Sequence, residues 1–307
     1  MNQYCSYKDL FKDIYSEDSI KVNEPMKNHI SFKVGGPADI LLEPSNDMQV
    51  IKTIKICRDN NVPYMIIGNG SNLLVKDGGI RGVVIKLSGL NSVNVDKNYI
   101  TAGAGVVLKE VSDVALDNSL TGFEFASGIP GSVGGAVFMN AGAYDGEMKN
   151  IINSVTALDK NDNIITLPKE KLEFGYRTSN IKTEGYIVLS AQFELQLGDK
   201  DKINNRIEEL TQKRVEKQPL EYASAGSTFK RPEGYFAGKL IQDAGLKGFS
   251  VGDAEVSQKH SGFVINTGNA TAQDVLDVIK HVQDEVKNQF GVELKTEVRI
   301  IGEDLQK

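Results

Sequence analysis

Two glycine-rich segments are the first places in the sequence where the backbone could bind a ligand. They are residues 68–72 (GNGSN) and residues 126–135 (ASGIPGSVGG). Glycine allows positive φ and close approach of the backbone to a ligand, and successive exposed N–H groups can then bind an anion without a basic side chain. Ser71, Asn72 and Ser132 add neutral donors. Each segment alone could be an ordinary turn, but the pair indicates a site for a diphosphate between two ring systems.

Several polar residues of the C-terminal third could bind phosphates. The cations are Arg214, Lys217, Lys230 and Arg231, although those on a helix could equally form a solvated charged face. His260, between Lys259 and Ser261, could bind phosphate or cap a turn. From the residues alone, both alternatives stay open.

Two further residues could carry proton chemistry. Ser227 lies in a flexible GSTF turn and could be a proton donor or only a turn serine. Glu297 lies in an expected strand on the same face as Arg299 and could be an exposed edge charge. No histidine and carboxylate set has metal-ligand spacing, so we expect no metal site.

The elements around the first glycine-rich segment exclude one nucleotide-binding fold. A strand over 38–43, a helix over 48–60 and a strand over 64–67 form a βαβ-type unit that ends at Gly68. In a Rossmann motif a helix begins at the glycines. Here LLVKDGGIRGVVIKL follows, and its β-branched runs broken by glycines predict a hairpin. The Rossmann motif is therefore excluded.

The remaining patterns predict a mixed succession of helices and strands. Seven glycines in residues 121–146 exclude one long helix. Thr271 is the expected cap of a strongly amphipathic helix over 271–290. The other expected elements are helices over 106–118 and 203–217 and strands around 154–167, 186–197 and 294–301. A charged turn at 198–202 predicts a domain boundary, so we expect one domain over 20–202 and another over 203–303, after a helix or tail over 1–19.

Composition restricts the class of protein. The 307 residues carry a net charge of −6 without a long basic run, which argues against a nucleic-acid partner. The two cysteines, Cys5 and Cys57, do not form a disulfide framework, which fits a reducing cytoplasm. The first twenty residues contain no apolar signal core, and no run of eighteen apolar residues occurs. We expect a cytoplasmic enzyme with small-molecule ligands and no membrane insertion; its oligomeric state stays open.

Taken together, the motifs resemble a known flavoenzyme family. GNGSNLLVKDGGIRGVVI (68–85) and GFEFASGIPGSVGGAVFMNAGAY (122–144) resemble the FAD-binding domain of the vanillyl-alcohol oxidase/para-cresol methylhydroxylase type. Later motifs are similar to those of the UDP-N-acetylenolpyruvoylglucosamine reductases, in the same order: 174–179, 214–232, 237–248, 256–266 and 296–302. The resemblance implies an α+β fold, with a two-part FAD-binding domain of that type over 20–202 (two subdomains, split near 88–100) and a C-terminal α+β substrate domain over 203–303.

The resemblance also implies an activity and its catalytic residues. Such an enzyme reduces the enolpyruvyl ether of UDP-N-acetylglucosamine to UDP-N-acetylmuramate in peptidoglycan biosynthesis, and hydride passes from NADPH to FAD to substrate. Arg177, of the Y-R-x-S motif, would stabilise charge on the substrate carboxylate. Ser227 would deliver the proton as general acid. Glu297 would assist, and it could do so only when protonated.

The resemblance further implies where the ligands bind. No histidine or cysteine occurs in residues 58–142, so we expect FAD to be bound non-covalently. The expected substrate contacts are Tyr176, Lys217, Arg231 and His260. The expected FAD contacts are Gly68, Asn69, Gly70, Ser71, Asn72, Leu73, Ala126, Gly128, Ile129, Pro130, Gly131, Ser132, Gly134, Gly135, Ala136 and Asn140.

Longer members of the family carry an inserted loop with a tyrosine that closes over the substrate. No counterpart is evident between residues 178 and 214, so the chain resembles the shorter subgroup. Two alternatives remain: an FAD-dependent alcohol or sugar oxidase of the same superfamily, and a non-catalytic nucleotide-binding module.

Overall fold

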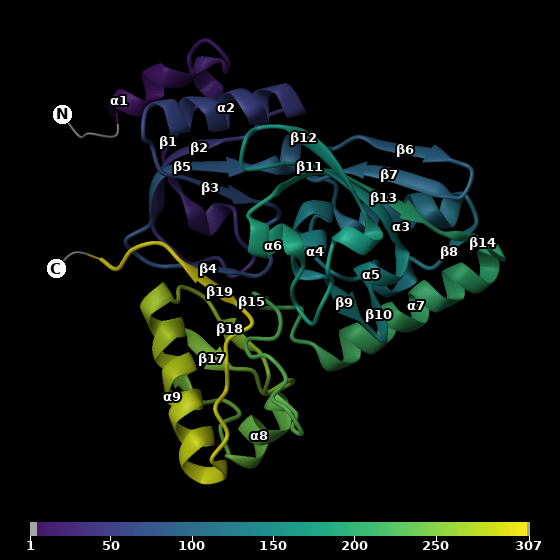
Figure 1. Cartoon of the computed structure of the whole chain (residues 1–307). Coiled ribbons are helices and arrows are strands. Elements are labelled where there is room, and N and C mark those ends of the chain that lie inside the picture. The colour runs from purple at the N-terminus through teal and green to yellow at the C-terminus, as the bar shows by residue number, and fades with distance from the viewer. Residues whose placement is uncertain (1–4, 306–307) are drawn as a thin grey trace. The chain divides into compact units, whose positions relative to one another are not determined.

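A computed structural model describes residues 5–305 of the chain (Figure 1). It describes the side chains of residues 7–305. The chain forms two compact units, each built from segments that are not continuous in sequence. Unit 1 comprises residues 1–21, 41–69 and 83–214, and unit 2 comprises residues 22–40, 70–82 and 215–307. The folding domains expected from the sequence, divided near residue 203, stay a prediction, because compactness does not show which segments fold together.

The first sheet contains both strands of the predicted strand–helix–strand unit. Its order is β1–β2–β5–β3, with β1 Lys21–Pro25, β2 Pro37–Leu42, β5 Ile80–Lys86 and β3 Tyr64–Ile67. Helix α2 (Asp47–Asp59) connects β2 to β3 and begins at Asn46, whose side chain accepts a hydrogen bond from the Gln49 N–H. Asparagine is a favoured cap because its oxygen satisfies an otherwise unpaired amide. The predicted helix and both strands are confirmed.

The hairpin predicted after the first glycine-rich segment is wrong. Strand β4 (Leu73–Val75) pairs in parallel with β19 (Arg299–Ile301), whereas β5 pairs with β3. The glycines allow close approach instead of a hairpin turn. A Cβ atom on Gly79 would lie 1.9 Å from the Pro37 carbonyl oxygen, so only glycine fits there.

A five-stranded antiparallel sheet forms the centre of unit 1. Its order is β12–β11–β13–β7–β6: β12 Ile164–Pro168, β11 Ile152–Leu158, β13 Ile187–Glu194, β7 Tyr99–Gly103 and β6 Val93–Asp96. Helix α4 (Val133–Met139) packs on β13. Ile100, Val155 and Phe193 are fully buried in this core. The strands expected around 154–167 and 186–197 are confirmed.

Further helices and strand pairs complete unit 1, and the last of these helices, Lys200–Lys217, continues into unit 2 at residue 215. Helix α3 (Leu108–Asp117) confirms the helix expected over 106–118. Helix α7 (Lys200–Lys217) begins three residues before the expected position, so most of the charged turn at 198–202 is helical. The others are helices α1 Cys5–Lys8, α5 Met148–Ile151 and α6 Asn180–Glu184, and the strand pairs β8 Leu120–Thr121 with β14 Gln196–Leu197 and β9 Gly142–Ala143 with β10 Gly146–Glu147.

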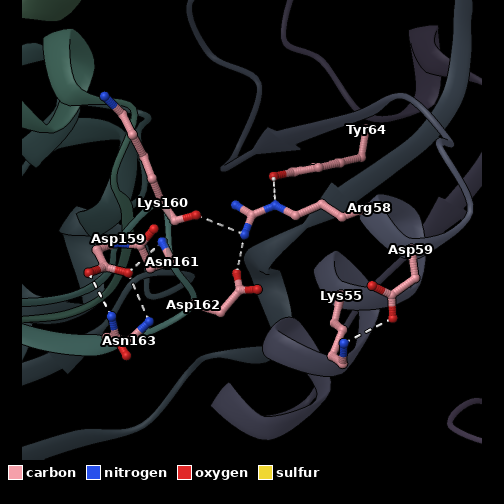
Figure 2. A network of polar contacts seen from close by, with 9 residues as sticks. All are labelled: Lys55, Arg58, Asp59, Tyr64, Asp159, Lys160, Asn161, Asp162 and Asn163. Atoms are coloured by element: carbon pink, nitrogen blue, oxygen red, sulfur yellow. Dashed lines mark hydrogen bonds and ion pairs between the residues drawn. The ribbon is translucent and has the colours of Figure 1, made fainter.

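A polar network fixes the turn between β11 and β12 within unit 1 (Figure 2). The Arg58 guanidinium, at the end of α2, donates to the Lys160 carbonyl oxygen at 3.1 Å and forms an ion pair with Asp162. Its Nε atom donates to the Tyr64 hydroxyl at 3.3 Å. Because these side chains are partly exposed, the network contributes only about 0–1 kcal/mol per ion pair. The network therefore restricts the position of the turn but adds little to the stability of the fold.

A four-stranded antiparallel sheet and helix α9 form most of unit 2. The sheet order is β15–β18–β17–β16: β15 Ala223–Ser224, β18 Val264–Asn266, β17 Ala254–Val256 and β16 Ser250–Val251. Helix α8 (Ala237–Asp243) precedes β16. Helix α9 (Ala272–Phe290) packs on β16, β17 and β18 through a buried face of Val275, Val278, Ile279, Val282 and Val286. This is the amphipathic helix that the sequence predicts.

The first turn of α9 is held by residues from two parts of the chain. Thr271 and Asp274 form a capping box. The two carboxylate oxygens of Asp77 accept the N–H groups of Ala272 and Gln273, each at 2.9 Å. A carboxylate at a helix N-terminus is stabilising by about 0.3–1 kcal/mol. The segment before β5 is thereby attached to the C-terminal helix.

The last strand is shorter than expected. Strand β19 covers only Arg299–Ile301, because the N–H groups of Glu297 and Val298 both point to the Thr228 carbonyl oxygen, at 2.8 and 3.4 Å. No helix within residues 5–305 combines the length and apolar character that spanning a bilayer requires.

Candidate active site

The two glycine-rich segments approach each other within unit 1. A Cβ atom added to Gly68, after β3, would lie 2.3 Å from the Ser132 Oγ atom. The Asn69 side chain donates to the Pro130 carbonyl oxygen at 2.7 Å. The residues before Gly70 and residues 130–132 are therefore neighbours, as a shared ligand site requires.

This arrangement fits a flavin diphosphate. Ser132 is 2% exposed, and no described residue makes a hydrogen bond to its hydroxyl. A buried hydroxyl without a partner is unfavourable by roughly 1–3 kcal/mol, so it favours a ligand that accepts a hydrogen bond from it. Because Gly68 has no side chain, its backbone is accessible beside the Ser132 hydroxyl.

Arg214, the last residue of unit 1, lies against the second glycine-rich segment. Its Cδ atom would be 3.0 Å from a Cβ atom on Gly128. The side chain is half-buried, and burial lowers its pKa. Within residues 5–305 its guanidinium has no hydrogen-bond or ion-pair partner. A partly desolvated cation of this kind is stabilised by a nearby anion, which argues against the solvated-face alternative.

Arg177 occupies a tight turn of unit 1. Gly175 and Thr178 exchange backbone hydrogen bonds of 3.0 and 3.3 Å, and Arg177 has a φ of +55°. Its Nη2 atom donates to the Gly142 carbonyl oxygen at 3.3 Å, and its guanidinium carbon is 5.1 Å from the centre of the Tyr176 ring. Tyr176 is 57% exposed. A cation is thus presented from a turn whose backbone is fixed at both ends.

Ser227 and Glu297 lie on adjacent segments of unit 2. The Glu297 N–H donates to the carbonyl oxygen of Thr228, the residue after Ser227. The Asn72 side chain donates to the Glu297 carbonyl oxygen at 3.2 Å, and the Asn72 carbonyl oxygen accepts the Arg299 N–H at 3.0 Å. Ser227 is exposed, and its hydroxyl bonds to no other described residue. One expected cofactor residue, Asn72, therefore contacts one expected catalytic residue.

Three of the expected substrate contacts, Lys217, Arg231 and His260, also lie in unit 2. The His260 Nδ1 atom accepts the Gly262 N–H at 3.1 Å, so the neutral ring carries its proton on Nε2. Burial lowers the pKa of His260, which makes it a neutral donor at pH 7. The Thr228 N–H donates to the Gly262 carbonyl oxygen at 2.9 Å, so His260 is close to the Ser227 segment.

Arg231 and Lys217 differ in how they are held. The Arg231 guanidinium carbon is 3.9 Å from the centre of the Phe236 ring, and its Nε atom donates to the Tyr235 carbonyl oxygen at 3.3 Å. Lys217 is exposed at the end of α7, and no contact in the described part of the chain joins it to Arg231 or His260.

The expected site residues are divided between the units. Arg177 belongs to unit 1, whereas Ser227 and Glu297 belong to unit 2. The expected FAD contacts divide in the same way, with residues 68–69 and 126–140 in unit 1 and residues 70–73 in unit 2. The meeting of all three catalytic residues therefore stays a prediction. No group of three or more metal-binding side chains occurs among the described residues.

Comparison with known proteins shows the family to which the chain belongs. The family model of an FAD binding domain matches residues 38–168. The model of the C-terminal domain of UDP-N-acetylenolpyruvoylglucosamine reductase matches residues 218–301. The reductase of Clostridium perfringens is 62% identical over 304 residues, covering 99% of this chain and 100% of its own length. The chain belongs to the UDP-N-acetylenolpyruvoylglucosamine reductase family. It is an FAD-dependent oxidoreductase, which confirms the activity and cofactor that the motifs imply.

Solved structures agree with this assignment. The crystal structure of the reductase from Thermus caldophilus has a TM-score of 0.78 and 35% identity, and the match covers 92% of this chain and 99% of that one. Alkyldihydroxyacetonephosphate synthase matches 64% of this reductase and 41% of its own chain at 16% identity and a TM-score of 0.50, which indicates a shared fold only. In this reductase α6, β13, β14 and α7 occupy residues 180–217 with short connections. No long inserted loop is present there, as the sequence predicts.

Proposed function

We propose that this reductase transfers hydride from NADPH, through FAD, to the enolpyruvyl ether of UDP-N-acetylglucosamine and so produces UDP-N-acetylmuramate for peptidoglycan biosynthesis. The observation that carries the proposal is the juxtaposition of Ser227 and Glu297 in a chain that belongs to the family over its whole length. FAD, when bound, supplies a group that accepts and then donates hydride.

The chain's own residues would bind FAD through its diphosphate. The backbone at Gly68 and Asn69 and the segment Gly128–Ser132 would surround it, and the unpartnered Ser132 hydroxyl would donate a hydrogen bond. The Arg214 guanidinium would supply the positive charge that the glycine-rich segments lack. The motifs did not indicate Arg214 as a cofactor contact, and the signal that reveals it is its burial against Gly128.

The remaining residues would act on the substrate. Arg177 would pair with the enolpyruvyl carboxylate and stabilise the negative charge that develops on it. Ser227 would donate a proton to the carbon adjacent to that carboxylate. Glu297, in its protonated form, would donate a hydrogen bond to the developing enolate. Tyr176, Lys217, Arg231 and His260 would contact the substrate, with the last three at its diphosphate.

We also propose that the reductase works in the cytoplasm with small-molecule partners only. Cys57 is a buried free thiol, and burial raises its pKa to about 12, so it is unreactive. A chain with a buried free thiol suits a reducing compartment. The acidic net charge argues against a nucleic-acid partner.

The visible spectrum of the purified protein tests this function. We expect flavin absorbance, its loss on anaerobic addition of NADPH, and its return when the enolpyruvyl ether is added. Rapid return with oxygen, after reduction by an alcohol or sugar and without NADPH, would instead indicate an oxidase. A colourless protein that still binds UDP-sugars would indicate a binding module.

Changing Gly68 to alanine tests the proposed FAD site. The new Cβ atom would lie 2.3 Å from the Ser132 Oγ atom, and relieving such overpacking typically costs about 1–3 kcal/mol. We expect FAD binding to weaken about five- to a hundredfold, measured by titrating FAD into apoprotein. Gly238→Ala is the control, because its Cβ atom would make only ordinary contacts, at 3.5 Å or more. Unchanged FAD affinity in Gly68→Ala would remove Gly68 from the site.

A further inference from the structure

Asn140 is a buried residue with a saturated side chain. It is 0% exposed. Its Nδ2 atom donates to the Glu147 carboxylate at 2.6 Å and to the Gly175 carbonyl oxygen at 3.1 Å, and its Oδ1 atom accepts the Lys149 N–H at 3.0 Å. A carboxamide whose donor and acceptor groups are both engaged with the protein is poorly placed to bind a cofactor. A contact to FAD, which the motif implies, is therefore disfavoured.

The turn that carries Arg177 is attached to the end of α4 at three points. Asn140 contacts Gly175 at the start of the turn. The Ser179 hydroxyl, just after the turn, donates to the Phe138 carbonyl oxygen at 3.0 Å. Arg177 itself donates to the Gly142 carbonyl oxygen. All three contacts are made within residues 138–142, so this segment helps to fix the position of the turn.

The other end of α4 begins in the second glycine-rich segment. Its first residues are held by hydrogen bonds from the Val133 N–H to the Val106 carbonyl oxygen and from the Gly134 N–H to the Ala104 carbonyl oxygen, each at 2.9 Å. A seven-residue helix is about 10 Å long, and α4 packs on β13. Helix α4 is thus a short rigid connection between the proposed FAD site and the Arg177 turn.

Asparagine suits this position for two reasons. Residue 140 ends α4 in the left-handed region, with φ 44° and ψ 58°, which asparagine tolerates better than most side chains. The side chain must also donate to two acceptors and accept from one donor. Aspartate lacks the donor and would place a second carboxylate beside Glu147. Glycine suits the backbone but leaves all three partners unsatisfied.

We propose that Asn140 is a positioning residue that holds the Arg177 turn at a fixed place relative to the flavin. The inference rests on the proposed function for the role of Arg177, but the attachment of the turn rests on the contacts alone. Asn140 acts on catalysis only through Arg177.

Limited proteolysis tests the attachment without any reaction. Trypsin cleaves after Arg177, and in Asn140→Gly we expect cleavage there to be at least about tenfold faster than in wild type, while cleavage after Arg58, which lies in the same unit, is unchanged. Asn23→Gly is the matched control, because Asn23 is also left-handed but is exposed and remote in sequence from both cleavage sites. Equal acceleration at both sites, or none, would overturn the proposal.

Kinetics test the link to Arg177. In Asn140→Gly holoenzyme we expect flavin reduction by NADPH and FAD affinity within about threefold of wild type. Flavin reoxidation by the enolpyruvyl substrate should slow about ten- to a hundredfold, as a misplaced group produces. In an Arg177→Ala background, Asn140→Gly should add nothing.

Several results would contradict this inference. Additive effects of Asn140→Gly and Arg177→Ala would show that Asn140 acts independently of Arg177. Weaker FAD binding with normal reoxidation would make Asn140 a cofactor contact. If Arg177→Ala reoxidises normally, the proposed role of Arg177 fails, and the tryptic cleavage rates still decide whether Asn140 attaches the turn.

Discussion

Changing Ser227 to alanine should separate the two half-reactions of this reductase. We expect NADPH to reduce the flavin within about twofold of the wild-type rate. Reoxidation by the enolpyruvyl substrate should fall by about two to four orders of magnitude, the typical contribution of a positioned general acid. The effect is specific because the Ser227 hydroxyl makes no hydrogen bond to another described residue, so its removal disturbs no contact of the fold.

Anaerobic stopped-flow absorbance measures both rates in the same preparation. Ser250→Ala, an exposed serine of β16 in the same unit, is the control and should match wild type in both. Equal losses in the two half-reactions of Ser227→Ala would refute a role in proton donation, because flavin reduction needs no proton from Ser227.

The second large effect is expected for Glu297→Gln. The hydrogen bonds that place Glu297 beside Thr228 and Asn72 use its backbone N–H and carbonyl groups, so glutamine keeps them. Only the carboxyl group is lost. We expect reoxidation to slow by about two to three orders of magnitude, as for loss of one group that stabilises a transition state, with flavin reduction unchanged.

The measurement is again single-turnover reoxidation, together with the melting temperature. Glu255→Gln in β17 is the control, since it makes the same change in the same unit. Full reoxidation activity in Glu297→Gln would remove this side chain from the mechanism. If reoxidation slows and the melting temperature also falls well below that of wild type, Glu297 has a structural role instead.

Local patterns predicted the helices well. Helix α9 follows from a continuous apolar face and a threonine cap, and α2 follows from the periodicity of its apolar residues. Both signals lie within about twenty consecutive residues, where helix formation is decided by the chain's immediate neighbours. The family motifs likewise predicted the reductase activity and the FAD cofactor, because each motif is a short continuous stretch of sequence.

Features that depend on distant partners were not predicted. The glycines at 78–79 indicated a hairpin, but β4 pairs with β19, and Gly79 is required by the approach of Pro37. The final strand is interrupted by the Thr228 carbonyl oxygen, which no local pattern reveals.

Two side chains of the candidate site show the same limit of prediction from sequence. Arg214 could equally have lain on a solvated helix face, and only its burial against Gly128 separates the alternatives. Asn140 lies in a motif that implies FAD binding, but its carboxamide binds Glu147 and Gly175 instead. Sequence indicates the residue types, whereas burial and contacts assign their roles.

The parallel pairing of β4 with β19 has a consequence for how the protein is made. Leu73 pairs with Arg299, about 225 residues further along the chain. At about 5–20 residues per second, the ribosome exposes β4 for roughly 11–45 seconds before its partner has been translated. During that interval its backbone N–H and carbonyl groups form an open strand edge, which can pair with another nascent chain. Slowing translation after residue 75 should therefore increase aggregation in the cell and the demand for chaperones.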